Sequence, residues 1–125
     1  MKTRPKDLGT RQETRIVRAA QDTGLISERL AEGGSTDRGD VRILTNHEWI
    51  IESKDRQQLN IHQALDKALR KSGTHRTAVI WRRMTRQPGN TRRTQDGPIV
   101  VALTLDTFLQ LLHADTDQET NHAQA

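Results

Sequence analysis

One short segment of the chain combines an apolar run with two charged side chains. The segment Trp49-Ile50-Ile51-Glu52-Ser53-Lys54 is rich in β-branched and aromatic residues, as strands are. Side chains two positions apart in a strand point to the same face, so Glu52 and Lys54 share one face of this strand. An acid and a base placed together at the end of an apolar strand add little to stability, so we interpret the pair as candidates for chemistry.

A second carboxylate stands twelve residues earlier. Asp40 follows Gly39 and opens the apolar stretch Val41–Leu44, and the residues 45–47 that follow suggest a hairpin. In such a hairpin Asp40 can lie near Glu52. Two close carboxylates repel each other unless a cation lies between them, and oxygen ligands of this type suit Mg²⁺ or Mn²⁺. The alternative is that both are solvated strand-end charges and that Glu52 and Lys54 form a plain surface ion pair.

The spacing Asp40…Glu52-Ser53-Lys54 is that of the PD-(D/E)xK nucleases. Other segments resemble the archaeal-type Holliday junction resolvases within that superfamily. The segment 9–13, Gly-Thr-Arg-Gln-Glu, is similar to their opening helix, and Arg29, Gly34 and Ser35 ahead of Asp40 are similar to their Arg…Gly-Ser…Asp segment. The resemblance covers roughly residues 9–112. Ser53 stands where a valine is commoner, and 85–98 looks like an enlarged loop.

This resemblance implies a metal-dependent DNA endonuclease, structure-selective and similar to a Holliday junction resolvase, that hydrolyses phosphodiester bonds for DNA recombination or repair. Asp40 and Glu52 would hold Mg²⁺ or Mn²⁺ together with the backbone carbonyl of Ser53. Glu13 would bind the metal or an outer-shell water. Lys54 would orient or deprotonate the attacking water and offset charge in the transition state. Ser35 would contact a phosphate near the cleavage site or assist there.

Several of these residues also have a structural interpretation. Thr10-x-x-Glu13 fits a capping box at a helix start, and Ser35 fits a turn in a glycine-rich stretch. Gln58 and Gln63 are better explained as solvated helix residues than as members of the site. The remaining polar and aromatic candidates are interpreted as surface or core residues; these are His47, His62, His75, Trp49 and Trp81.

The charge distribution favours a polyanionic partner. The chain has a net charge of +4, and its last thirteen residues hold three acidic residues and no Lys or Arg, so residues 1–112 carry +7. Five arginines fall within twelve residues and predict a DNA-contacting loop; they are Arg82, Arg83, Arg86, Arg92 and Arg93. Arg29 is predicted as a further DNA-contacting residue. The alternative is an ordinary solvated loop.

Hydrophobic periodicity and turn residues predict the helices and strands that position these side chains. Helices are predicted at 10–23, 60–71 and from 105, strands at 25–30, 40–44, 48–54 and 77–82, a long loop at 85–98, and a buried strand at 99–103. This order predicts an α/β protein with a restriction-endonuclease-like core, a mixed central sheet flanked by helices. We expect a flexible arm over 1–8, a nuclease domain over 9–112 and a disordered acidic tail over 113–125.

Composition restricts the expected cellular location of the protein but leaves more than one function open. The chain has no cysteine, no signal-peptide pattern and no apolar run long enough to cross a membrane, so we expect a cytoplasmic protein without a membrane partner. The leading hypothesis is a homodimer that cuts branched DNA at two symmetric sites. The alternatives are a nicking, repair or restriction-like nuclease of the same fold and a non-catalytic DNA-binding module.

Overall fold

A mixed β-sheet flanked by helices forms the body of the protein. The computed structural model describes residues 5–30, 38–73, 76–86, 88–89 and 92–124, and within them the side chains of residues 11–116. The elements, in chain order, are α1 (Pro5–Asp22), β1 (Ile26–Arg29), β2 (Val41–Leu44), β3 (Glu48–Arg56), α2 (Ile61–Ser72), β4 (Thr77–Arg86), β5 (Arg93–Gln95), β6 (Val100–Ala102) and α3 (Leu105–Gln124). The α/β class and the mixed sheet expected from the sequence are confirmed.

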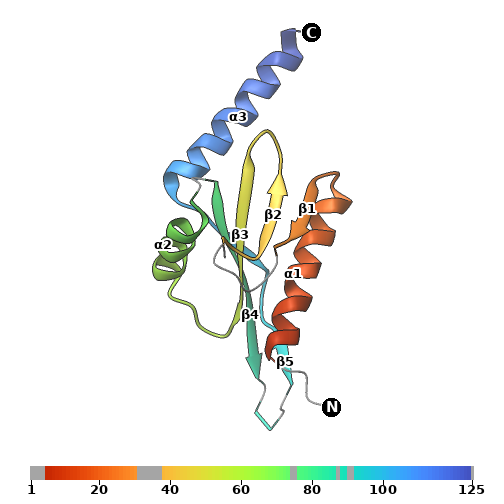
Figure 1. Ribbon diagram of the computed structural model, residues 1–125, viewed down its shortest axis with the longest axis vertical. Coiled ribbons are helices and arrows are strands. Elements are labelled where there is room, and N and C mark those ends of the chain that lie inside the picture. Colours follow the sequence, from red (N-terminus) through yellow and green to blue (C-terminus); the bar gives the residue numbers. More distant parts are fainter. Residues whose placement is uncertain (1–4, 31–37, 74–75, 87, 90–91, 125) are drawn as a thin grey trace.

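The strand order places the predicted hairpin next to the centre of the sheet. The strands run in the order β1-β2-β3-β4-β5, and β6 also pairs with β4. The β2–β3 pair is antiparallel, with Val41 opposite Ile51, whereas β3 and β4 are parallel. Parallel neighbours need a crossover connection, which α2 supplies. The hairpin predicted from the Asp40–Lys54 segment is therefore present (Figure 1).

The two faces of β3 have different neighbours. Val41, Ile51 and Ala78 form the buried core cluster, and Ile16 and Val17 of α1 pack against it. Since side chains alternate along a strand, the positions next to Ile51 face the other side of the sheet, where α2 lies (Figure 1). Glu52 and Lys54 therefore face α2 and not α1.

Both ends of α2 are capped by residues suited to that position. The side chain of Asn60 accepts a hydrogen bond from the backbone N–H of Gln63, which satisfies one of the free donors of the first turn. Gly73 ends the helix in the left-handed conformation, with φ of 69°. Ala68, 3% exposed, is a buried contact of the helix with the sheet.

The first helix begins earlier than predicted. It starts at Pro5, so residues 5–8 are helical and do not belong to a flexible arm. Proline is favoured at the first helical position because its missing N–H has no partner there in any case, and its fixed φ suits the helix. Thr10 is consequently an interior helix residue, which excludes the capping-box interpretation of Glu13.

The C-terminal third also differs from the prediction. Part of the loop expected at 85–98 forms β5, which pairs with the end of β4 across a turn containing Pro88 and Gly89. Strand β6 is not buried, because it lies at an edge of the sheet, and Val101 is 59% exposed. The tail expected to be disordered is helical as far as Gln124, since a helix once nucleated gains a hydrogen bond for each residue added. None of the described helices is both long and apolar enough to cross a membrane.

Gly39 is required by a close approach at the start of β2. Its φ is +154°, and a Cβ at this position would lie 2.5 Å from Cγ2 of Ile50. We expect Gly39→Ala to lower the free energy of unfolding by about 1–3 kcal/mol, the usual cost of overpacking a core, and to displace the neighbouring Asp40. Chemical denaturation measures the loss.

Gly24→Ala is the matched control. Gly24 also has a positive φ, of +91°, but a Cβ added there would meet no atom within 4 Å. This variant reports the backbone strain alone. A loss at Gly39 no larger than that at Gly24 would show that the contact with Ile50 does not constrain the β2 entrance.

Candidate functional site

Asp40 and Glu52 lie close together at one end of the β2–β3 hairpin. The last pair of the register is Val41 with Ile51, and the backbone N–H of Asp40, one residue before β2, donates to the carbonyl of Ile51 at 3.0 Å, which holds Asp40 beside β3. The two carboxylates are near enough for Asp40 to raise the pKa of Glu52. The Asp40 carboxylate also accepts a hydrogen bond from the backbone N–H of Ser53 at 2.8 Å, which fixes its position beside β3.

Glu52 is buried and contacts two lysines. The residue is 9% exposed. Lys54 Nζ lies 3.7 Å from its Oε1, and Lys71 Nζ, from α2, lies 3.4 and 3.5 Å from its two carboxylate oxygens. Burial raises the pKa of Glu52 above its ordinary value, and repulsion from Asp40 raises it further, while Lys71 and Lys54 act in the opposite direction.

The arrangement fits a divalent cation with few protein ligands. A cation between Asp40 and Glu52 would offset their mutual repulsion, and both supply the hard oxygen atoms that Mg²⁺ and Mn²⁺ prefer. Within the described ranges, no group of three or more His, Cys, Asp or Glu side chains could hold a metal ion. A cation held by these two carboxylates and the Ser53 carbonyl would complete its coordination with water and substrate, as Mg²⁺ commonly does.

Glu13, the α1 residue predicted for the site, contacts β1. Glu13 is 7% exposed and forms an ion pair with Arg29 of β1 at 3.1 Å, so its described contact ties α1 to the sheet edge. Its part in a metal site stays a prediction. The neighbouring Gln12, which sequence reasoning missed, is 1% exposed and donates a hydrogen bond to the carbonyl of Lys54 at 3.1 Å. Ser35 lies outside the described residues.

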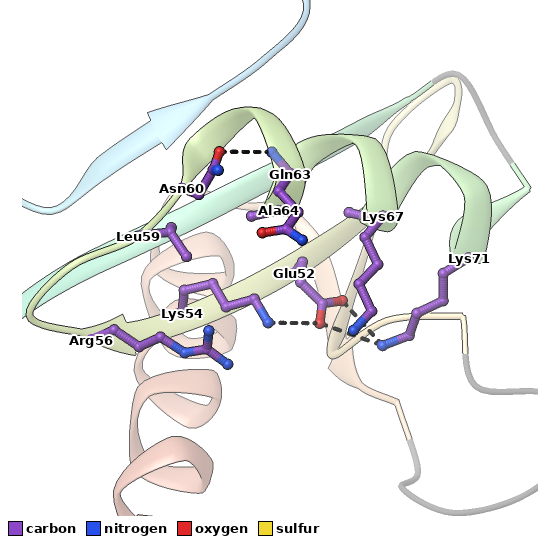
Figure 2. Close-up of a pocket in the computed structure, with 10 residues that line it drawn as sticks. Glu52, Lys54, Arg56, Leu59, Asn60, Gln63, Ala64, Lys67 and Lys71 are labelled. Atoms are coloured by element: carbon purple, nitrogen blue, oxygen red, sulfur yellow. Dashed lines mark hydrogen bonds and ion pairs between the residues drawn. The ribbon is translucent and has the colours of Figure 1, made fainter.

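A cationic pocket lies between β3 and α2, next to Glu52. Its cavity of about 330 Å³ is lined by Glu52, Lys54, Arg56, Leu59, Asn60, Gln63, Ala64, Lys67, Ala68 and Lys71. Figure 2 shows Lys54, Lys67 and Lys71 directed toward the Glu52 carboxylate from two elements. The α2 residues of this pocket were not predicted as functional. The available signal was the spacing of Gln63, Lys67 and Lys71 at intervals of four, which places them on one helix face.

The arginines predicted to contact DNA separate into two groups. Arg82 is 5% exposed and makes a bidentate pair with Asp55, with N–O distances of 3.2 and 2.7 Å. Its guanidinium is therefore not available to contact DNA. The two residues face each other across the parallel β3–β4 pair. Arg83 pairs with Asp96 at 3.2 Å. The others are exposed on the β4–β5 ribbon: Arg86, Arg92 and Arg93.

Comparison with protein-family models, curated proteins and solved structures finds no match for this chain. Its function is therefore inferred from the residues and their geometry.

The raised pKa of Glu52 predicts a pH-dependent difference between the metal-free protein and Glu52→Gln. A carboxyl whose pKa is higher in the folded than in the unfolded chain contributes its full stability below the unfolded value, here 4.5, and loses it as the pH rises through the folded value. We expect the unfolding temperature of the variant relative to the wild type to increase from about pH 4 to pH 8 in EDTA. Thermal unfolding across this range measures it. A difference that is constant or falls with pH would contradict the burial of this charge.

Proposed function

We propose that this protein is a metal-dependent DNA endonuclease of the PD-(D/E)xK type with a restriction-endonuclease-like core. The observation that carries the proposal is that Asp40 is held beside β3 next to Glu52, with Lys54 on the face of β3 that carries Glu52 and in contact with it. The order α1-β1-β2-β3-α2-β4, in which the acidic residues lie on a central hairpin, supports the core assignment.

The chemistry proposed for the site is hydrolysis of a phosphodiester by water. A bound Mg²⁺ or Mn²⁺ would lower the pKa of a water molecule and screen the phosphate charge. Asp40 and Glu52 would hold this ion, and the hydrogen bond from Ser53 N–H fixes the Asp40 carboxylate for that purpose. Lys54 would orient or deprotonate the water as its oxygen bonds to phosphorus, and would stabilise the negative charge that develops before the P–O bond to the leaving oxygen breaks. Glu13 stays a candidate outer ligand.

The preferred substrate of the proposed enzyme is branched DNA, cut by a homodimer. A four-way junction has two-fold character, and one domain of this size offers one candidate site, so symmetric resolution needs two copies. The exposed apolar residues of β6 and α3 supply a surface for the second copy. The arginines of the β4–β5 ribbon would contact phosphates outside the site.

A cleavage assay tests the proposal and separates it from its alternatives. Labelled four-way junctions, flaps, duplexes and single strands are incubated with the protein in Mg²⁺, in Mn²⁺ and in EDTA. We expect paired, symmetric incisions in the junction that require the metal. Single nicks would favour a nicking or repair nuclease. Binding without cleavage of any substrate would favour a non-catalytic DNA-binding module, in which Glu52 serves only as the ion-pair partner of Lys54 and Lys71.

A further inference from the structure

The pocket between β3 and α2 holds more positive charge than its own carboxylate can neutralise. Four cationic side chains line it, from Lys54, Arg56, Lys67 and Lys71, against the single carboxylate of Glu52. Lys54 and Lys71 share that carboxylate. The side chains of Arg56 and Lys67 make no ion pair within the described part of the chain. A concave surface with such an excess favours an anionic ligand.

The geometry of α2 directs this charge into one groove. Gln63, Lys67 and Lys71 are spaced by four residues and therefore lie in a row on one helix face. All three line the pocket, and Figure 2 shows the two lysine side chains extending from α2 toward β3. Like charges four residues apart on a helix repel each other, so an anion between α2 and β3 would remove a cost that the free protein carries. The cavity of about 330 Å³ lies at the small end of the range for ligand sites.

The β4–β5 ribbon offers less free charge than its sequence suggests. Arg82 is buried against Asp55, and Arg83 pairs with Asp96. The groove, by contrast, begins at Glu52 itself, one of the two proposed metal ligands. An anion seated in it would lie next to the proposed reaction centre, whereas the ribbon is formed by the far end of β4.

We infer that the groove between α2 and β3 binds the sugar-phosphate backbone of the DNA strand that is cut, with Arg56 and Lys67 contacting phosphates that flank the scissile one. Lys71 is shared between Glu52 and this strand. The inference rests on the proposed nuclease function and adds the path of the substrate strand to it. It makes α2, which the sequence resemblance does not include in the site, the main DNA-contacting helix.

Equilibrium binding in EDTA tests the groove without cleavage. The probe is a fluorescein-labelled duplex, titrated at several salt concentrations with the wild type and with Arg56→Gln, Lys67→Gln and Lys71→Gln. Each lost phosphate contact reduces the salt slope by about 0.9, which corresponds to roughly five- to tenfold weaker binding at 0.1 M salt. The Arg56→Gln/Lys67→Gln double variant should lose about twice this slope. Thermal unfolding of each variant checks that the fold is retained.

Arg70→Gln is the matched control. Arg70 is on the same helix and its loss changes the net charge equally, but it is exposed and pairs with Asp66 away from the groove. We expect the wild-type slope for this variant. Equal weakening by Arg70→Gln and Lys67→Gln, or an unchanged slope in the groove variants, would overturn the inference. If the wild-type protein binds DNA through the groove but cuts none, the proposed hydrolysis is contradicted, whereas the inferred DNA-binding role of the groove is supported.

Discussion

Replacing Asp40 with Asn or Glu52 with Gln is expected to lower metal-dependent DNA cleavage by about a thousandfold or more. Either change removes a negative ligand of the proposed cation, whose charge stabilisation contributes several kcal/mol to the transition state. Asn at position 40 keeps an oxygen that can accept the hydrogen bond from Ser53 N–H, so the β2–β3 geometry should survive. Single-turnover cleavage at saturating DNA measures the loss.

DNA binding by these variants should persist or become tighter, because each removes a charge that repels phosphate. Asp22→Asn is the control for a lost acidic residue, since Asp22 is exposed at the end of α1. Its cleavage rate should equal that of the wild type. Undiminished cleavage by both purified site variants would remove Asp40 and Glu52 from the chemistry and end the PD-(D/E)xK proposal.

The second large effect concerns the exposed apolar surface of the C-terminal segment. Eight large apolar residues between positions 99 and 112 are at least 39% exposed: Ile99, Val100, Val101, Leu105, Phe108, Leu109, Leu111 and Leu112. Monomeric proteins rarely expose a contiguous patch of this kind. Figure 1 shows α3 extending away from the sheet, and β6, in the part of the chain described, pairs with β4 only. A second copy can cover both elements in an isologous contact.

Leu109→Asp is therefore expected to convert a dimer into a monomer. Leu109 is 51% exposed, so the change should hardly alter the stability of the single chain, whereas burying an unpaired carboxylate in an apolar interface costs several kcal/mol. The association constant should fall by roughly a hundredfold or more. Sedimentation at micromolar concentration, with and without junction DNA, measures it.

Gln110→Asp, its exposed neighbour on α3, adds the same charge at a polar position and should stay dimeric. If the junction is cut by two copies, Leu109→Asp should produce single nicks at a retained rate per site. A wild type that is monomeric with and without DNA would contradict the symmetric arrangement and favour a nicking enzyme, without affecting the metal-site chemistry.

The features best predicted from the sequence are those set by local patterns. The alternation around Ile51 determined which face carries Glu52, and hydrophobic periodicity together with turn residues placed α2. The order of the elements followed from the same signals. The errors lie where tertiary packing decides the outcome: the apolar run at β6 is equally compatible with a buried or an edge strand, and only the complete sheet shows that it is exposed.

Only the part of the candidate site that lies on the β2–β3 hairpin was predicted from the sequence. Asp40, Glu52 and Lys54 lie together because their spacing is local. Arg82 was misassigned, because its pairing with Asp55 depends on the register between two parallel strands that a helix separates in sequence. The lysines of α2 were missed for a related reason, since the rotation of α2 about its axis, and so which face meets β3, is set by packing.

The position of a bound divalent cation is the most direct test of the proposed metal site. Crystals of the protein soaked with Mn²⁺, measured at the manganese absorption edge, would show each bound ion as an anomalous peak. We predict one strong peak in contact with both the Asp40 and Glu52 carboxylates, and its loss in Asp40→Asn. An ion bound elsewhere, or no peak in contact with these two carboxylates under conditions that support cleavage, would contradict the proposed site.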